Sequence, residues 1–411
     1  MTHTSIHLSN PTIVLPERIT AGDLPVVNGR VAAQAPGAWT IDLRDHLVFP
    51  GLINAHDHLQ LNNIPPLPHA APFPNSYAWI AAFQPHFQDP AVAAAVAIPP
   101  DLRHWQGGLK NLLCGATTVA HHDHWRSILD DPDFPVRLLR DFGWSHSLGL
   151  GLEPGAWSLE LGSDQSPFAA LRSLARYGPP VIGSYWATAA GRPWIIHLAE
   201  GADDLAAGEL SLLEAVGCLN ANTVLVHGVG LTETDVGRVI ACGAAVVWCP
   251  GSNIRMLGRT LDPRRLFDAG RLALGSDSRI SANRDLLDEL RVAAAQSDLG
   301  PADLLRLVTG DASRVLAMPD VGGLDPGQHA DLLIVADRGG DPYRALVELQ
   351  RSDIRAVVRG GAPAIADPDF AEWFDACGIA TAQIVLDGRP KLMAKALARP
   401  DVFVLEPGLN L

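Results

Sequence analysis

The sequence predicts an α/β protein in which strand–helix units form a central (β/α) barrel beside a small β-sandwich. Two observations support this prediction. Apolar strands alternate with amphipathic helices through the middle of the chain, and short strands separated by turns occupy both ends. We expect residues 51–319 to form the barrel, and residues 1–50 and 320–411 to form the β-sandwich together.

The two terminal segments have the pattern of short strands. Residues 12–33 and 39–51 alternate short apolar runs with turns. A similar pattern returns at residues 327–337 and 353–365. We therefore expect the two ends of the chain to pair with each other and to flank the central barrel.

The central segment has the pattern of repeated strand–helix units. An amphipathic stretch at 104–113 precedes a strand at 115–122. Further on, four apolar strands alternate with three helices, the second of which has Thr232 as a plausible N-cap. The strands are expected at 193–201, 223–231, 244–252 and 271–278, and the helices at 203–217, 232–243 and 262–270. Near-continuous apolar strands of this kind are typical of a parallel sheet covered on both faces.

The segment from 126 to 192 is harder to interpret. We expect a strand at 145–153 and a helix at 167–178 that ends at a glycine. The pattern does not fix the number of strands in this segment. The prediction of a barrel therefore depends on the strand–helix units in the rest of the chain.

The composition of the sequence limits the classes of partner and the cellular location that we expect. The formal net charge of −14 and the pI near 5.4 argue against nucleic acid or an anionic membrane as a partner. The five cysteines are widely spaced without a C-x-x-C pair, which indicates free thiols in a reducing compartment. The N-terminal residues do not have the pattern of a secretory signal, and no apolar run is long enough to span a bilayer. We expect a cytoplasmic protein.

Chemically active side chains recur where the predicted strands end, which is where a (β/α) barrel carries its catalytic residues. Each residue alone is more often a loop residue than a ligand, but their convergence on one end of a barrel favours a functional site. The residues are His56 and His58, the cluster His121 to His124, His197 followed by Glu200, His227, and Asp277.

Neutral imidazoles with one carboxylate form a ligand set that suits zinc, and also Fe(II) or Mn(II). A bound metal lowers the pKa of its water from about 15.7 to about 7, so a nucleophilic hydroxide is available at neutral pH. A serine or cysteine nucleophile is then not required. No G-x-S-x-G, P-loop or G-x-G-x-x-G motif in the sequence indicates a different chemistry.

Six motifs, in chain order, carry a resemblance to a known family: FPGLINAHDHL, HLAEG, VHGVGLTETD, WCPGSNIRMLG, ALGSDS and VGGLDPGQHADLLIVAD. They resemble the amidohydrolase superfamily, and the nearest branch is the chlorohydrolase/aminohydrolase group, which includes triazine hydrolases and cytosine and guanine deaminases. The resemblance extends from about residue 35 to about residue 360. It implies a TIM-like (β/α)8 barrel with a small β-sandwich.

The resemblance also implies a role for each site residue. One divalent metal per chain is bound, with zinc favoured over iron and manganese, by His56, His58, His197 and Asp277. Asp277 also takes a proton from the bound water, and Glu200 carries that proton to the substrate nitrogen or leaving group. His227 orients the hydroxide or polarises the scissile carbon.

A second metal, bridged by a carboxylated lysine as in many relatives, is excluded by the sequence. The only lysines are Lys110, Lys391 and Lys395, so none lies between residues 111 and 390. A carboxylate such as Glu153 is a less favoured substitute for the bridge. One metal per chain is therefore the prediction, and a homodimer is suggested by analogy alone.

The sequence departs from the family pattern after two strands. The AHHDHW stretch contains more imidazoles than expected, and we assign His122 and His124 to substrate contact, with a second cation site or a polar pocket rim as alternatives. Asn253 and Arg255 are also assigned to substrate contact; for Arg255 the alternative is a structural salt bridge. Asp57 faces away from its histidine neighbours on a strand, so we give it no catalytic role.

These observations predict a metal-dependent hydrolase that cleaves a C–N bond in a small molecule. Deamination of an amidine-like ring carbon is the leading reaction, because Glu200 supplies the acid that an amine leaving group needs. Hydrolysis of a cyclic amide or imidazolone with the same residues is the alternative. A non-catalytic assembly protein is the third reading, which the complete ligand set disfavours.

Overall fold

The computed structural model describes residues 5–149 and 178–410, and its central part is built from parallel strands. These strands form two sheets, in the orders β10-β9-β8 and β11-β12-β13-β14-β15. Their bounds are β8 Leu52–Asp57, β9 Ala116–His121, β10 Arg137–Leu138, β11 Gly143–Ser145, β12 Trp194–Leu198, β13 Thr223–His227, β14 Ala245–Trp248 and β15 Leu272–Leu274. The prediction of an α/β fold with parallel sheets is confirmed.

The two parallel sheets meet where β8 and β15 end. The backbone N–H of Asp277, just after β15, donates a hydrogen bond of 3.0 Å to the carbonyl of His56 in β8. Every residue of β8, β12 and β13 is buried, as expected for strands covered on both faces. Parallel pairing brings the carboxyl ends of these strands to one edge, where the predicted site residues lie.

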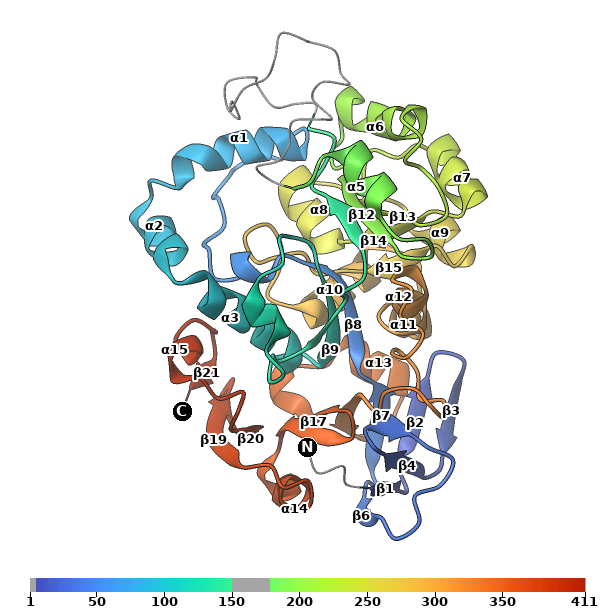
Figure 1. The fold of residues 1–411 in the computed structure, drawn as a ribbon, viewed down its shortest axis with the longest axis vertical. Helices are drawn as coiled ribbons and strands as arrows, with labels where there is room; N and C mark the ends of the chain where they lie inside the picture. The colour runs from blue at the N-terminus through green and yellow to red at the C-terminus, as the bar shows by residue number, and fades with distance from the viewer. Residues whose placement is uncertain (1–4, 150–177, 411) are drawn as a thin grey trace.

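Helices follow most of the central strands and cover them on the outside (Figure 1). The predicted helices at 203–217, 232–243 and 262–270 are confirmed as α6, α7 and α9. The Thr232 side chain caps α7 as predicted, through a reciprocal capping box with Asp235. The helices of this part are α1 Ser76–His86, α2 Pro90–Ala97, α3 Pro100–Leu113, α5 Val181–Ala187, α6 Asp204–Ala215, α7 Glu233–Cys242, α8 Pro250–Leu257, α9 Arg264–Asp268, α10 Leu286–Gln296, α11 Pro301–Leu307 and α12 Gly310–Val315.

The segment from 126 to 192 differs from its prediction where the structure describes it. The predicted strand at 145–153 is wrong over residues 146–149, because β11 spans Gly143–Ser145 and ends where that strand was expected to begin. Residues 150–153 of that strand, including Glu153, lie outside the described residues, as does nearly all of the helix expected at 167–178. Within the described part, β10, β11 and α5 are the regular elements of this segment.

Strands from the two ends of the chain pair in one sheet, as expected from their patterns. β7 pairs antiparallel with β16, from His46 opposite Ala336 to Pro50 opposite Leu332. The strands of this sheet, in spatial order, are β21 Leu409–Asn410, β19 Thr381–Leu386, β20 Arg389–Ala394, β18 Ala362–Ala366, β17 Ile354–Arg359, β16 Leu332–Ala336, β7 His46–Pro50, β2 Thr12–Leu15 and β3 Arg18–Ala21.

A smaller sheet packs beside this one and shares a hydrophobic core with it. Its order is β5-β4-β1-β6, and Leu8 and Val26 from it join Val48, Ile334 and Val358 of the larger sheet in one cluster. Figure 1 shows these terminal strands together below the central strands. The bounds are β1 Ile6–Ser9, β4 Leu24–Val27, β5 Arg30–Val31 and β6 Trp39–Asp42, and the C-terminal helices are α13 Pro342–Val347, α14 Ala371–Ala376 and α15 Pro400–Phe403.

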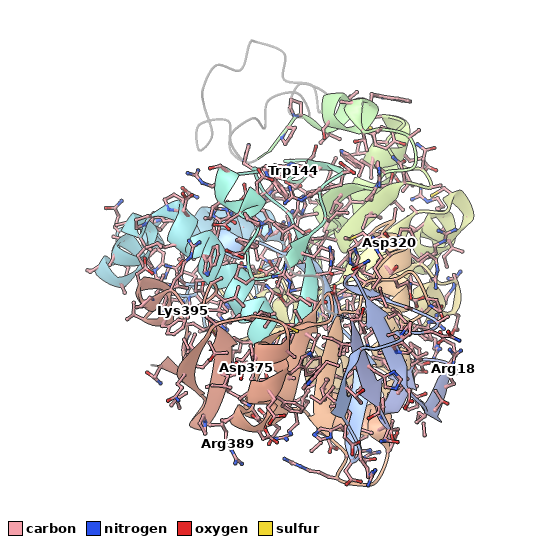
Figure 2. All side chains as sticks on the ribbon, turned by 60° about the horizontal axis from the view of Figure 1, so that its bottom comes forward. Arg18, Trp144, Asp320, Asp375, Arg389 and Lys395 are labelled. Carbon is pink, nitrogen blue, oxygen red and sulfur yellow. The ribbon has the colours of Figure 1, made fainter. Side chains whose placement is uncertain are left out.

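The terminal strands carry charged side chains at the positions that face solvent. Figure 2 shows Arg18 and Arg389 projecting from this region, and both residues are exposed. Among the described residues, no helix has the length and apolar character needed to cross a membrane.

Glu406 joins the C-terminal segment to the central part of the molecule. Its buried carboxylate accepts two hydrogen bonds of 2.8 Å from the guanidinium of Arg279, which follows Asp277 by two residues. Gln106 of α3 and Arg351 donate to the same carboxylate. The loop after β15 is therefore held in place by a residue more than 120 positions further along the chain.

Candidate active site

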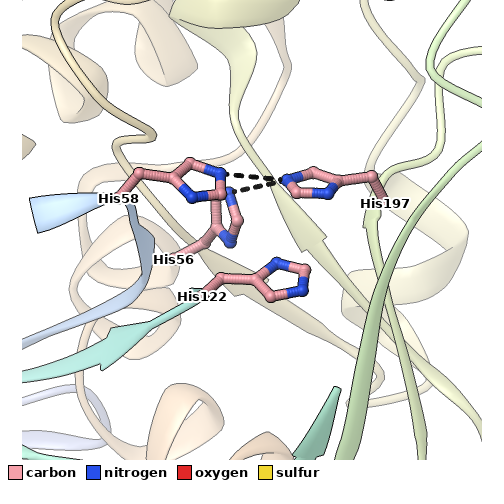
Figure 3. Close-up of side chains that lie close together, drawn as sticks. All are labelled: His56, His58, His122 and His197. Atoms are coloured by element: carbon pink, nitrogen blue, oxygen red, sulfur yellow. Dashed lines mark hydrogen bonds between the residues drawn. The ribbon is translucent and has the colours of Figure 1, made fainter. Parts of the chain in front are cut away.

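Three imidazoles converge at the carboxyl ends of the central strands. Nε2 of His197, in β12, lies 3.2 Å from Nε2 of His58 and 3.3 Å from Nε2 of His56. Figure 3 shows these rings turned toward one another, with His122 beneath them. His56 lies in β8, and His58 follows directly after that strand. The two side chains face the same side because side chains alternate along a strand. The predicted H-x-H pair and His197 are therefore brought together.

The donor atoms of this cluster fit a metal ion. Burial, and then the neighbouring imidazoles, hold the pKa of His56 and of His197 well below the usual range, so both rings are neutral and offer lone pairs. Nitrogen ligands at 2.0–2.1 Å from one tetrahedral zinc ion lie about 3.3–3.4 Å apart. The observed spacings around His197 match that value.

Asp277 adds a carboxylate to the cluster. Its Oδ1 lies 3.7 Å from Nε2 of His56 and 3.9 Å from Nε2 of His58. Its Oδ2 accepts hydrogen bonds from the hydroxyls of Ser252, at 2.8 Å, and Ser281, at 2.7 Å. Burial alone would raise the pKa of Asp277, but the facing imidazoles and these hydroxyls lower it, so the group is ionised at neutral pH.

Glu200 and His227 form a second pair beside the cluster. Oε1 of Glu200 lies 3.3 Å from Nε2 of His227, and Nδ1 of that ring lies 2.8 Å from Oδ1 of Asn253. The backbone of Glu200 is fixed by α1, because the N–H of Ser76 donates to its carbonyl at 2.9 Å. Burial raises the pKa of Glu200 despite the attraction of His227, which favours a carboxyl group that can hold a proton.

The backbone is strained where these side chains emerge. Ala199, His227 and Asp277 have φ values of 53°, 77° and 52°, in the left-handed region that non-glycine residues rarely adopt. Each residue lies at or just beyond the end of a central strand. Strain of this kind is concentrated at functional sites, where the surrounding structure holds side chains in directions that a regular strand would not allow.

A cavity of about 240 Å³ opens above the cluster. His58, His197, His227, Glu200 and Asp277 belong to its lining. Its walls are mostly apolar, with Gln60, Gln84 and Asp123 among the polar residues of the lining. The apolar residues are Leu61, Ile64, Trp79, Ile80, Phe83, Phe87, Met256 and Ile280. A few convergent polar groups at one end of an apolar cavity are the usual composition of a small-molecule site.

Comparison with known proteins gives similarity to one family. The model of the amidohydrolase family matches residues 184–364, which include His197, Glu200, His227 and Asp277. This segment of the chain is therefore similar to the amidohydrolase family. A 5-methylthioadenosine/S-adenosylhomocysteine deaminase of Pyrococcus furiosus is 25% identical over 343 residues, covering 74% of this chain and 78% of the relative. An 8-oxoguanine deaminase of Pseudomonas aeruginosa is 25% identical over 418 residues, covering 84% and 90%.

Solved structures share the fold of this chain. An adenosine deaminase from Xanthomonas campestris, with bound zinc, superposes with a TM-score of 0.68 at 22% identity, over 91% of this chain and 97% of its own. Atrazine chlorohydrolase from Arthrobacter aurescens, complexed with zinc, superposes with a TM-score of 0.67 at 20% identity, over 87% and 95%.

The residues assigned to substrate contact lie in different surroundings. Asn253 is buried behind His227 and hydrogen-bonded to it, and His122 lies in the imidazole cluster. His124 is exposed, with its Nδ1 3.0 Å from Asp123. Arg255 is exposed and donates to the carbonyl of Ala282 at 3.2 Å. None of these four side chains lines the cavity among the described residues.

The apolar side of the cavity that α1 contributes was not predicted from the sequence. Trp79, Ile80 and Phe83 line the cavity from α1, and Phe87 follows at the helix end. Their spacing of three to four residues places them on one face of a helix. That spacing was the available signal, although periodicity alone cannot distinguish a pocket wall from a core face.

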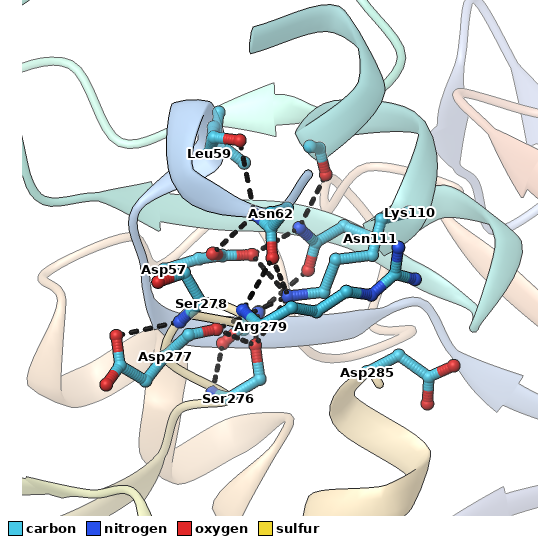
Figure 4. Close-up of polar contacts among 12 residues, drawn as sticks. Asp57, Leu59, Asn62, Lys110, Asn111, Ser276, Asp277, Ser278, Arg279 and Asp285 are labelled. Atoms are coloured by element: carbon cyan, nitrogen blue, oxygen red, sulfur yellow. Dashed lines mark hydrogen bonds and ion pairs between the residues drawn. The ribbon is translucent and has the colours of Figure 1, made fainter. Parts of the chain in front are cut away.

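A buried polar cluster lies directly behind the cluster of imidazoles (Figure 4). Lys110 of α3 donates to Oδ2 of Asp57 at 3.1 Å, to Oδ1 of Asn62 at 2.8 Å and to the carbonyl of Asp277 at 3.3 Å. Asn111 adds a hydrogen bond of 2.7 Å to Asp57. Asp57 thus faces away from the imidazoles, as the strand pattern predicted, and anchors the strand between His56 and His58.

Replacing Lys110 with Met should destabilise the protein by about 3–5 kcal/mol, because it leaves the charge of Asp57 buried without its cation. Urea unfolding curves of the wild type and the variant give this difference. The double variant Lys110→Met/Asp57→Asn removes both charges and should cost less than Lys110→Met alone. A double variant as unstable as the single one, or more so, would contradict this account of the ion pair.

Glu289 predicts a pH dependence of stability. Burial raises its pKa from 4.5 to about 8, although the N–H of Gly251 in α8 donates to its Oε2 at 2.8 Å. The folded state therefore binds more protons than the unfolded state between pH 4.5 and about 8, and the stability that Glu289 contributes is lost as the pH rises through this window. Glu209 and Asp285, with pKa values raised to about 7 and about 6 by burial, act in the same direction.

The Glu289→Gln variant should show a shallower fall in the free energy of unfolding between pH 5 and pH 8 than the wild type does, because glutamine does not titrate. Unfolding midpoints measured across this range give the two slopes. The slope that remains in the variant combines the fall from Glu209 and Asp285 with the opposite contribution of buried imidazoles such as His56 and His197, whose pKa values are lowered. The difference between the two proteins is therefore the quantity that reports Glu289. Parallel curves for the two proteins would show that Glu289 has an ordinary pKa.

Proposed function

We propose that this protein removes an amino group from a ring carbon of a small molecule by metal-dependent hydrolysis. One observation carries the proposal: Glu200 lies 3.3 Å from His227 at the base of an apolar cavity, beside three imidazoles and a carboxylate that fit a divalent metal. The named deaminases among the relatives, for 5-methylthioadenosine/S-adenosylhomocysteine and for 8-oxoguanine, support the same reaction class.

Each residue of the proposed site has a task. His56, His58, His197 and Asp277 would hold the metal, with zinc as the proposed ion. When bound, a divalent metal lowers the pKa of a water molecule from about 15.7 to about 7. Asp277 accepts the proton of the attacking water, Glu200 delivers a proton to the departing nitrogen, and His227, held by Asn253, orients the reacting groups.

The apolar walls favour a ring that carries an apolar substituent. Aromatic and aliphatic side chains, among them Trp79 and Phe83 of α1 and Met256 of α8, form the apolar part of the lining. A substituent that places charge or several hydroxyl groups against Trp79, Phe83 and Met256 would lose its hydration without gaining partners there. Alkyl or thioether substituents would instead gain from burial.

The proposal is tested by measuring ammonia release from aminopurines, aminopyrimidines and aminotriazines after reconstitution with zinc. We expect ammonia, with rings that carry apolar substituents preferred over hydroxylated ones. Ring opening without ammonia would identify a cyclic amide or imidazolone hydrolase. Metal binding without turnover of any ring would favour the non-catalytic reading.

The architecture proposed for the whole chain follows the same family. We infer that the eight parallel strands between residues 51 and 319 close into a TIM-like barrel, and that residues 1–50 and 320–411 form a composite β-sandwich. A small molecule is the proposed partner. The cytoplasmic location, the absence of nucleic-acid and membrane partners and the homodimer stay predictions.

A further inference from the structure

We propose that His122 is a fourth imidazole ligand of the metal and binds it through Nδ1. The centre would then consist of His56, His58, His122, His197 and Asp277. This inference rests on the proposed function, because it places the metal in the same cluster. It replaces the substrate contact that the sequence suggested for His122.

The position of His122 carries the first step of the argument. Its ligand atom and those of His56, His58 and His197 all lie within 4.8 Å of one another. Its ring is nearly parallel to that of His197, with centroids 4.4 Å apart, and lies 5.2 Å from that of His56. In Figure 3 the ring lies beneath the other three with one nitrogen turned toward them. His122 thus adjoins the cluster, and a small shift of its side chain would bring it to the 3.2–3.3 Å spacing of the ligand atoms around His197.

Hydrogen bonding identifies which nitrogen is free. Nε2 of His122 lies 3.0 Å from the carbonyl oxygen of Ser145, which can only accept, so Nε2 carries the proton and Nδ1 keeps its lone pair. Nδ1 is buried and has no hydrogen-bond partner among the described residues. An unpaired buried polar atom is costly, and a metal ion beside it would remove that cost.

His197 shows the same arrangement with its nitrogens exchanged. Its Nδ1 lies 2.6 Å from the carbonyl oxygen of His146, and its Nε2 faces His56 and His58. Histidine ligands usually donate their second N–H to a carbonyl or carboxylate, which fixes the tautomer and the ring orientation. His122 has this outer partner in the carbonyl of Ser145.

The lining of the cavity indicates whether His122 is placed as a metal ligand or as a substrate contact. His58, His197 and His227 line the cavity, whereas His56 and His122 do not. His122 is 1% exposed, and its free nitrogen faces the cluster from behind, as that of His56 does. A side chain in this position reaches the metal site but does not reach a ring bound in the cavity.

The chain places His122 there through β9. The N–H of His122 donates to the carbonyl of Asp57 at 3.0 Å, which extends the pairing of β9 with β8 by one residue. Because side chains alternate, His121 faces α3, where its ring lies 5.4 Å from that of His104, and His122 faces the imidazole cluster. The AHHDHW stretch therefore contributes one residue, His122, to the imidazole cluster, and a second, Asp123, to the cavity lining.

X-ray absorption spectroscopy of the zinc-loaded full chain tests the inference by counting imidazole ligands. We expect four in the wild type and three in the His122→Phe variant, which keeps a planar ring but has no nitrogen. The zinc affinity of this variant, measured by competition with a chelator, should fall at least tenfold, since even the loss of an outer-shell partner typically costs 10–100-fold. His121→Phe is the matched control and should bind zinc as the wild type does.

The outcomes separate this inference from the proposed function. Three imidazoles in the wild type, with unchanged zinc affinity in His122→Phe, would overturn the role of His122 and leave the proposed metal site intact. A wild type that binds no divalent metal would contradict both the role of His122 and the proposed metal-dependent function. If His122→Phe does not fold, as judged by circular dichroism, the imidazole count of the wild type decides.

Discussion

The Glu200→Gln variant should lose at least a hundredfold in kcat and keep its metal. Glutamine has nearly the same shape as glutamate but cannot transfer a proton, and general acid–base catalysis typically contributes 10²–10⁴-fold. Glu200 does not belong to the imidazole cluster, and its carboxylate lies 3.3 Å from Nε2 of His227, which is also outside that cluster. Metal binding should therefore be insensitive to this change.

Steady-state ammonia release and metal analysis on the same preparation check this prediction. Glu289→Gln is a suitable control, because Glu289 is also fully buried but does not line the cavity. It should keep near-normal turnover at neutral pH. Near-normal turnover in Glu200→Gln would remove Glu200 from the proton-transfer role and point to another acid beside the leaving group.

The second large effect is expected from the proposed ligands. His56→Ala and Asp277→Ala should each lose bound metal together with activity, because each variant lacks one of the proposed donors. His56 is completely buried, and its Nε2 lies 3.3 Å from that of His197 and 3.7 Å from the carboxylate of Asp277. An alanine at either position leaves a gap that no neighbouring side chain fills with a donor of the same kind.

Mass spectrometry of metal content, on protein purified without chelator, gives the result. The wild type should carry about one divalent ion per chain, and both variants much less than that. His104→Ala is the matched control, because His104 is buried and hydrogen-bonded to the carbonyl of Pro100, outside the cluster. Metal retained by His56→Ala would show that the proposed ligand set is wrong.

The parts of the fold that depend on local sequence could be predicted. The buried strands β12 to β15 and the helices between them have apolar runs and caps that are visible within a few residues, such as Thr232 and Asp235 at the start of α7. The H-x-H pair is equally local, because strand alternation alone makes His56 and His58 neighbours on one face.

The contacts that depend on packing could not be predicted. Lys110 reaches Asp57 because α3 packs on β8 in one particular register, and nothing near either residue in the sequence records that register. The same limit explains the assignment of the AHHDHW stretch. Its histidines are equivalent as letters, but the pairing of β9 with β8 buries His122 in the cluster and leaves His124 in solvent.

The left-handed residues at the strand ends illustrate a further limit. Glycine marks such positions in a sequence, but here they are occupied by alanine, histidine and aspartate at positions 199, 227 and 277. Their conformation is imposed by surrounding contacts, such as the hydrogen bond from the N–H of Asp277 to His56. The directions in which the side chains of His227 and Asp277 point therefore depend on contacts that form only in the assembled fold.

The anchoring of Arg279 by Glu406 has a consequence for the order in which the protein matures during synthesis. The loop that follows Asp277 is translated long before Glu406 emerges from the ribosome, so for that interval two guanidinium groups, those of Arg279 and Arg351, lack the carboxylate that they share in the native state. The nascent central strands can pair without it. The loop after β15, which carries the cavity-lining residues Ser278, Ile280 and Ser281, therefore gains this anchor only after translation of the C-terminal segment. A nascent chain stalled before residue 406 should show less activity than the full chain even though most of its strands are already made.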